Sequence, residues 1–315
     1  MAPVTALRTF VQPSPVNGSA ETARQIAAFV RGHSIAAARL SLADLRAFQT
    51  ALTPRTSVYL NAGRRVASEL IETAAQVRAI GLEPVPHIAA RDLASAGALD
   101  ELLARLAERA SVRRVLVIAG DRDCPAGPYA GAIEVVESGL LQRHGIAEAG
   151  IAAYPEGHPR ISPQVLDRAL AAKIEAATQT GLAVHIVTQF GFDADAILRW
   201  LARLRDLGIE QPVRIGVAGP TRLPTLLCYA QRCGVRASPQ GLMRQAGLLK
   251  HLVGTHAPDS IIRPLAEACT GGRFGRVGLH FYSFGGAAAA GRWAAAATAG
   301  RIVLDRAGGF GVEPA

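Results

Sequence analysis

Eight short, nearly continuous apolar runs alternate with longer amphipathic stretches, and this alternation constrains the fold more than any other feature of the sequence. An apolar run without polar alternation is typical of a parallel strand buried on both faces. Eight such strands, each followed by a helix, predict a single (β/α)8 TIM barrel. The predicted strands are Ser34–Leu40, Ser57–Gly63, Glu83–Ala90, Arg113–Gly120, Gly150–Glu156, Ala183–Phe190, Val213–Gly219 and Arg276–Phe284.

The amphipathic stretches predict helices between the strands, and cap-like residues such as Asp193 precede several of them. Two segments fall outside the repeat. Residues 1–33 are expected to form a leader with a helix at Ala20–Val30, and residues 238–272 to form extra helices before the last strand. The predicted domains are therefore the leader, 1–33, and the barrel, 34–315. A doubly wound sheet is the alternative fold, but the chain lacks the Gly-rich first turn of a dinucleotide site.

The net charge indicates which kinds of ligand the protein can bind. The 315 residues carry a net charge of +9, and among the 34 basic residues only Lys173 and Lys250 are lysines. The arginines are spread out rather than clustered, and 5% aromatic content leaves few stacking platforms. We therefore expect no nucleic-acid partner, and a small anionic ligand fits the basic surplus equally well.

Targeting and metal signals are also missing from the sequence. The four cysteines show no CxxC or zinc-like spacing, which predicts reduced thiols and no metal site. The N-terminal residues do not resemble a secretory signal, and Ala287–Gly300 is too short to span a bilayer. These features predict a cytoplasmic protein without membrane contact; a homo-oligomer is compatible with the sequence.

Polar side chains gather where the predicted strands end. In a (β/α)8 barrel the functional site lies at the carboxyl ends of the strands, so these side chains are expected on one rim. The chain has no GxSxG nucleophile motif and no zinc-ligand set, which argues against serine or metal hydrolysis. The rim residues are Asn61, His87, Asp121, Tyr154, Glu156, His158, Thr188, Gln189, His280, Tyr282 and Ser283.

Five strings at these strand ends carry a family resemblance: PHIA (86–89), IAGD (118–121), IAAYPEGHP (151–159), VTQFGFD (187–193) and HFYSF (280–284). In order and spacing they resemble the methylenetetrahydrofolate reductases, and the resemblance covers about residues 55–300. It implies a flavin-dependent barrel that passes a hydride from NAD(P)H through FAD to methylenetetrahydrofolate and yields methyltetrahydrofolate. A tetrahydrofolate derivative is thus the implied partner.

The resemblance also implies roles for single residues. Asp121 takes the place of the Asp that lies near flavin and pterin, where a carboxylate disfavours an anionic reduced flavin and favours a cationic folate iminium. Gln189 matches the pterin-binding amide, Phe190 and Phe192 lie in the run that walls the substrate site, and Tyr282 closes that site. Lys173 matches the lysine that meets the cofactor phosphates. The remaining positions that match the lining of FAD are His87, Gly120, Tyr129, Ala152, Tyr154 and His158.

The sequence departs from the family at defined positions. The first-strand Glu of SFEFFPP, the general acid of folate reduction, falls on Ala36 or Ala37, and Thr-Tyr-Gly after the second strand becomes Tyr59-Leu60-Asn61. Two arginines are replaced by Ala119 and Gly286. Losing a general acid costs about 10²–10⁴-fold in rate. The oxidative direction is therefore expected at least as much as reduction.

Two further interpretations stay open. One is a catalytically decayed folate- or flavin-binding barrel that serves a methyl-transfer enzyme. The other is direct hydride passage between nicotinamide and folate without a stable flavin, because the FAD-lining set is only partly kept.

Overall fold

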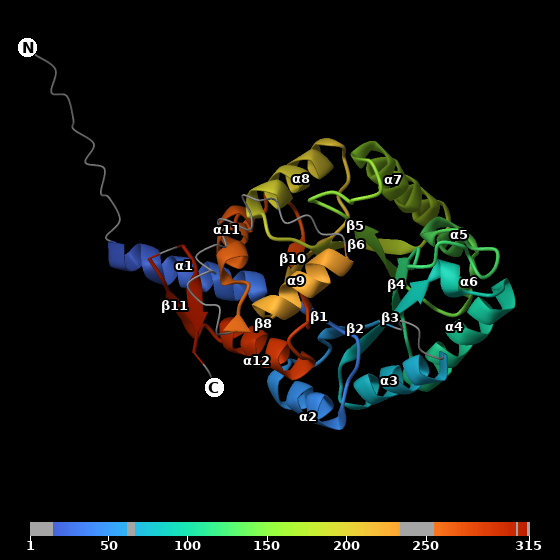
Figure 1. Ribbon diagram of the computed structural model, residues 1–315, viewed down its shortest axis with the longest axis horizontal. Helices are drawn as coiled ribbons and strands as arrows, with labels where there is room; N and C mark the ends of the chain where they lie inside the picture. Colours follow the sequence, from blue (N-terminus) through green and yellow to red (C-terminus); the bar gives the residue numbers. More distant parts are fainter. Residues whose placement is uncertain (1–14, 62–66, 234–254, 307, 314–315) are drawn as a thin grey trace, which may run out of the picture.

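The computed structural model describes residues 15–61, 67–233, 255–306 and 308–313. Eight parallel strands close into a barrel in the order β1-β10-β7-β6-β5-β4-β3-β2, with the helices around it (Figure 1). The predicted (β/α)8 barrel is confirmed. The first residue of each predicted strand lies within two residues of the first residue of the observed strand. The strands are β1 Ser34–Ala37, β2 Ser57–Leu60, β3 Glu83–Ala89, β4 Arg114–Ile118, β5 Glu148–Ala153, β6 Ala183–Phe190, β7 Val213–Ala218 and β10 Val277–Tyr282.

Helices follow the strands, and two small antiparallel sheets lie outside the barrel. The helices are α1 Pro15–Val30, α2 Leu42–Ala51, α3 Ala67–Ala79, α4 Ala96–Ala110, α5 Ala132–Glu137, α6 Leu140–Arg143, α7 Pro163–Gln179, α8 Ala194–Asp206, α9 Leu223–Arg232, α11 Asp259–Cys269 and α12 Ala287–Thr298. A 3₁₀ turn spans Ala90–Asp92. Outside the barrel, β8 Thr221–Arg222 pairs with β9 Thr255–His256, and β11 Ile302–Leu304 pairs with β12 Phe310–Val312.

Side-chain caps explain where several helices begin. Ser41 and Asp44 form a capping box at the start of α2, since each side chain bonds the other's backbone N–H. Ser95 accepts the Ala98 N–H at the start of α4, and Asp193 accepts the Ala196 N–H at the start of α8. The structure therefore uses Asp193 as a helix cap, as its sequence position indicates.

The segments outside the repeat lie beside the last helices. The leader helix α1 packs against α11 and α12, which Figure 1 shows as neighbours at one side of the barrel. Of the extra helices predicted for 238–272, α11 is observed, and the rest of that prediction falls on 234–254, outside the described residues. The division into domains 1–33 and 34–315 stays a prediction.

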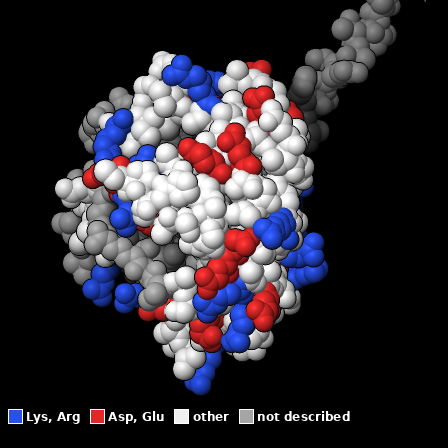
Figure 2. Space-filling view, turned by 90° about the vertical axis from the view of Figure 1, so that its right-hand side faces the viewer, with Lys and Arg blue, Asp and Glu red and all other residues white. Residues whose placement is uncertain are grey.

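The core has two parts. The larger part lies between the strands and the surrounding helices, and the smaller lies inside the barrel around Tyr59, Val85, Leu116 and Val187, with Ala36 packed on it. Basic and acidic side chains are interspersed on the face in Figure 2, so that face carries no large patch of one sign. No helix among the described residues is long and apolar enough to cross a membrane.

Candidate functional site

The carboxyl ends of β4 and β5 bring Asp121 and Tyr154 together. Gly120 has φ +91°, a left-handed conformation that favours glycine, and it turns the chain so that the next residue, Asp121, is exposed. Burial raises the pKa of Tyr154, and the negative charge of Asp121 raises that pKa further. The predicted catalytic carboxylate thus lies within electrostatic reach of a predicted cofactor residue.

A small, nearly filled cleft lies between the residues that follow β5 and those at the end of β6. Tyr154, Gln189 and Phe190 line it together with Glu156, Gly191 and Cys233. The side-chain oxygen of Gln189 accepts the Phe190 N–H at 3.1 Å, which fixes the orientation of its amide. The structure therefore places a predicted pterin-binding amide and a predicted flavin-lining tyrosine in one cleft. Sequence reasoning missed Cys233, because it lies beyond any strand end.

Aromatic side chains pack along one side of this rim. The Phe190 ring lies 5.7 Å from Phe192, 5.6 Å from Tyr282 and 4.9 Å from Phe284, between ring centroids. Phe284 in turn stacks on Tyr229 of α9 at 4.2 Å. The Tyr282 hydroxyl donates to the Thr188 carbonyl at 3.0 Å. The three predicted substrate aromatics form one cluster, and Tyr229 extends it from a helix that sequence reasoning did not assign.

Glu156 holds the segment that carries Phe192. Its Oε1 accepts the backbone N–H groups of Phe192 at 2.5 Å and of Asp193 at 2.8 Å. A side chain at Gly191 would lie 2.5 Å from the same oxygen, so only glycine leaves room for this contact. Burial raises the pKa of Glu156, while the two backbone N–H groups oppose that rise. Glu156 therefore has a structural role at the rim.

His87 is buried on β3, and Lys173 is half-buried on α7. Both ring nitrogens of His87 are buried without a hydrogen-bond partner, and burial lowers its pKa to about 4. Lys173 of α7 donates to the Ala152 carbonyl at 3.2 Å, and burial lowers its pKa to about 8. No carboxylate of the described residues forms an ion pair with Lys173. A ring with polar atoms would satisfy His87, and an anionic group would satisfy Lys173.

The last two predicted cofactor residues, His158 and Tyr129, lie in different surroundings. The ring of His158 meets the ring of Tyr154 edge-on at 5.2 Å, and its Nδ1 accepts the Arg160 N–H at 3.2 Å. Tyr129 is only 6% exposed and packs in the core between strands and helices. His158 thus lies at the rim with Tyr154, whereas the structure does not bring Tyr129 into the cleft.

This donor set fits the FAD that the resemblance implies. The lysine has no carboxylate partner among the described residues and suits a phosphate, and the unpartnered histidine nitrogens suit a ring with polar edges. No group of three or more His, Cys, Asp or Glu side chains among the described residues could hold a metal ion.

The interior of the barrel holds polar residues, and one of them is His280, which the sequence analysis expected at the rim. Tyr59 contacts His185, and the ring of His280 lies 4.5 Å from the Tyr59 ring. His280 is fully buried and its Nδ1 lies 2.8 Å from Ser34 Oγ. The positions of Tyr59 and His185 inside strands, flanked by apolar residues, offered no signal that distinguishes them from core residues.

Known proteins resemble this chain over most of the barrel. The family model "Methylenetetrahydrofolate reductase" matches residues 52–283. Similar proteins include the 5,10-methylenetetrahydrofolate reductases of Salmonella typhimurium, 28% identical over 64% of this chain and 66% of that protein, and of Pectobacterium carotovorum, 30% identical over 50% of each. That of Escherichia coli is 27% identical, with coverage of 64% and 66%.

The chain therefore spans less than two thirds of the length of the first of these relatives, and about half of the second. The family match covers well over half of the present chain and includes the ends of β2 to β7 and all of β10. From this match and the closed (β/α)8 barrel, we conclude that the chain belongs to the methylenetetrahydrofolate reductase family.

Proposed function

We propose that this protein is a flavin-linked oxidoreductase that interconverts 5,10-methylenetetrahydrofolate and 5-methyltetrahydrofolate. The observation that carries the proposal is that Tyr154 and Gln189 line one cleft and that the charge of Asp121 acts on Tyr154. An amide that both donates and accepts suits the edge of a pterin, and a nearby carboxylate favours the positive charge of a folate iminium.

The other rim residues have roles that follow from their contacts. Lys173 would hold an FAD phosphate, because among the described residues its ammonium donates to the Ala152 carbonyl and forms no ion pair with a carboxylate. His87 and Tyr154 would line the flavin, and the cluster of Phe190, Phe192 and Tyr282 would wall the folate. FAD, when bound, supplies the hydride carrier between folate and NAD(P)H. We propose cytoplasmic action on a small-molecule folate.

The test combines a spectrum with turnover. Purified protein should show flavin absorption and should convert either folate in the presence of NAD(P)H or an artificial acceptor. Asp121→Asn should lower turnover by about 10²-fold or more, because it removes the charge next to the reacting groups. Asp123→Asn, in the same exposed loop, should leave turnover unchanged. A protein that neither binds flavin nor converts either folate contradicts the proposal.

One observation favours the second candidate, a folate- or flavin-binding barrel without catalysis. Ala36 faces the barrel interior beside Tyr59, whereas Ala37 packs in the outer core. A first-strand carboxylate that serves the interior is therefore replaced by a methyl group at Ala36. Ala36→Glu separates the candidates: a large gain in turnover indicates a decayed enzyme, and tight folate binding without turnover before or after the change indicates a binder.

A further inference from the structure

An extra residue interrupts the regular pairing of β6 with β7 close to the rim. Val187 pairs with Arg214, whereas Phe190 pairs with Gly216, so β6 advances by three residues while β7 advances by two. A strand with one residue more than its neighbour forms a β-bulge. Because side chains alternate along a strand, the extra residue moves the side chains that follow it to the other face of the sheet.

This bulge turns Phe190 toward the candidate cleft. The alternation that places Val187 inside the barrel would place Phe190, three residues further on, outside it. The Phe190 ring lies instead 5.6 Å from the ring of Tyr282, between centroids, and Phe190 lines the cleft together with Gln189. The bulge thus brings two consecutive side chains of β6 to the same cleft, as bulges next to binding sites commonly do.

The side chain of Thr188 holds the bulge with two hydrogen bonds. Its hydroxyl accepts the Gly216 N–H at 2.8 Å and donates its single proton to the Gln189 carbonyl at 2.9 Å. Thr188 is fully buried. The first bond satisfies a backbone donor of β7 at the point where the register shifts, and the second fixes the backbone of Gln189 itself.

Two further residues constrain the backbone of the bulge. The Tyr282 hydroxyl donates to the Thr188 carbonyl at 3.0 Å, and it does so from β10, which lies on the far side of β7. A side chain at Gly216 would lie 2.5 Å from the Thr188 carbonyl oxygen and 2.9 Å from the Gln189 carbonyl carbon. Glycine at this position of β7 therefore leaves the space that the bulge occupies.

The bulge also fixes which end of the Gln189 amide is available to a ligand. The Phe190 N–H can only donate, so the atom that it meets at 3.1 Å is the amide oxygen of Gln189. The amide nitrogen then lies at the other end, and no described residue accepts a hydrogen bond from it. Gln189 therefore offers a donor to the cleft, which suits an acceptor atom of a ligand ring.

We propose that Thr188 is a positioning residue of the folate site, because it holds the bulge that directs the Gln189 amide into the cleft. The inference rests on the proposed function, in which this amide meets the edge of the pterin. Thr188 is fully buried and acts through Gln189 rather than on the ligand.

The main test compares Thr188→Val, which keeps the shape and removes the hydroxyl, with Thr188→Ser, which keeps the hydroxyl. In Thr188→Val, kcat/KM for the folate should fall about 10- to 10²-fold, because a misplacement of about 1 Å can cost that much. Thr188→Ser should retain kcat/KM close to that of the wild type. FAD affinity should be unchanged in both variants, since the Thr188 hydroxyl contacts no residue assigned to FAD.

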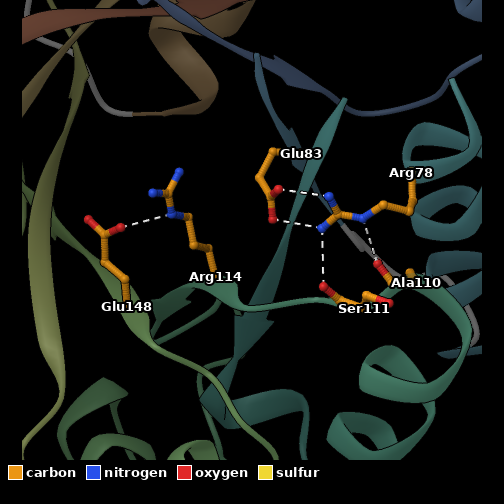
Figure 3. A network of polar contacts seen from close by, with 6 residues as sticks. All are labelled: Arg78, Glu83, Ala110, Ser111, Arg114 and Glu148. Carbon is orange, nitrogen blue, oxygen red and sulfur yellow. Dashed lines mark hydrogen bonds and ion pairs between the residues drawn. The ribbon is translucent and has the colours of Figure 1, made fainter. Parts of the chain in front are cut away.

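Two control variants separate this role from a loss of stability. Thr221 of β8 is a second buried threonine, and its hydroxyl has no hydrogen-bond partner among the described residues, so Thr221→Val should keep the wild-type kcat/KM. Ion pairs lie at the opposite ends of the strands (Figure 3). Arg78 meets Glu83 through two hydrogen bonds of 2.8 Å, and Arg114 pairs with Glu148 at 2.9 Å. Glu83→Gln should lower the free energy of unfolding and leave kcat/KM for the folate unchanged.

A double-mutant cycle tests whether Thr188 acts through Gln189. Gln189→Leu should lower kcat/KM for the folate by itself. Adding Thr188→Val should then cost little more, because the amide that the bulge directs is already gone. Equal fold-losses from Thr188→Val in both backgrounds, or no loss in either, overturn the positioning role alone.

Amide hydrogen exchange tests the bulge without any activity. The Gly216 N–H should exchange faster in Thr188→Val than in the wild type, and Thr188→Ser should restore its protection. An unchanged exchange rate at Gly216 in Thr188→Val overturns the positioning role. A wild-type protein that neither binds nor converts a folate overturns the proposed function, and the positioning role with it.

Discussion

The ammonium group of Lys173 on α7 lies 3.2 Å from the carbonyl oxygen of Ala152 on β5. This contact ties a helix outside the barrel to a strand at the rim and holds a cation next to the candidate cofactor site. The burial of Lys173 is unfavourable for the charged form, so the site gains when an anion arrives.

Replacing this lysine should therefore weaken flavin binding. For Lys173→Gln we expect FAD affinity to fall about 10- to 100-fold, because a hydrogen bond to a charged group contributes about 1.5–3 kcal/mol. Quenching of flavin fluorescence on titration measures the change. Arg168→Gln, an exposed site on the same helix, is the matched control. Equal affinity of Lys173→Gln and wild type would remove the lysine from the cofactor site.

The same lysine should make FAD binding depend on pH. Its pKa of about 8 in the free protein is below the ordinary value of 10.5, so the ammonium is lost as pH rises through about 8. Affinity should then decline above this pH, and Lys173→Gln should show no such decline. Between about 8 and 10.5 the unfolded chain binds the extra proton, so the free protein should gain stability as pH rises. Affinity measured from pH 6.5 to 9.5 gives the answer.

A methyl group at Gly216 should disturb the barrel wall. Its Cβ would lie 2.5 Å from the Thr188 carbonyl oxygen and 2.8 Å from the Tyr282 ring. Overpacking of this kind costs about 1–3 kcal/mol, so Gly216→Ala should lower the free energy of unfolding by that amount. Gly278→Ala, on the neighbouring strand β10, meets nothing within 4 Å and is the control. Urea unfolding that ranks the two variants equally stable would contradict this account.

Acid should weaken the fold through Glu148. Its pKa is lowered from 4.5 to about 2, so the stability it contributes is present above pH 4.5 and is lost as pH falls toward 2. Glu148→Gln should lose about 1 kcal/mol of stability at pH 7 and show a shallower decline in acid. Glu175→Gln, at an exposed site on α7, should keep the wild-type profile. Thermal unfolding from pH 7 to pH 3 measures both; an unchanged acid profile in Glu148→Gln contradicts the assignment.

Sequence patterns predicted most of the architecture. The strand from Ala183 to Phe190 was predicted with its observed bounds, because a buried parallel strand leaves an apolar run between polar turns. That Tyr154 and Gln189 line one cleft was also predictable, since parallel strands bring their carboxyl ends to one edge. Helices α5, α6 and α9 were not assigned, because α5 and α6 are short and the α9 sequence shows no capping side chain.

The sequence by itself determined that this chain closes a barrel and which strand ends lie together at its mouth. Only the tertiary structure decided which residues face inward. A strand buried on both faces is apolar in every position, so its sequence does not show whether Ala36 or Ala37 points into the barrel. The same limit hid the Tyr59–His185 contact, which joins residues 126 positions apart across the barrel and forms only when the sheet closes.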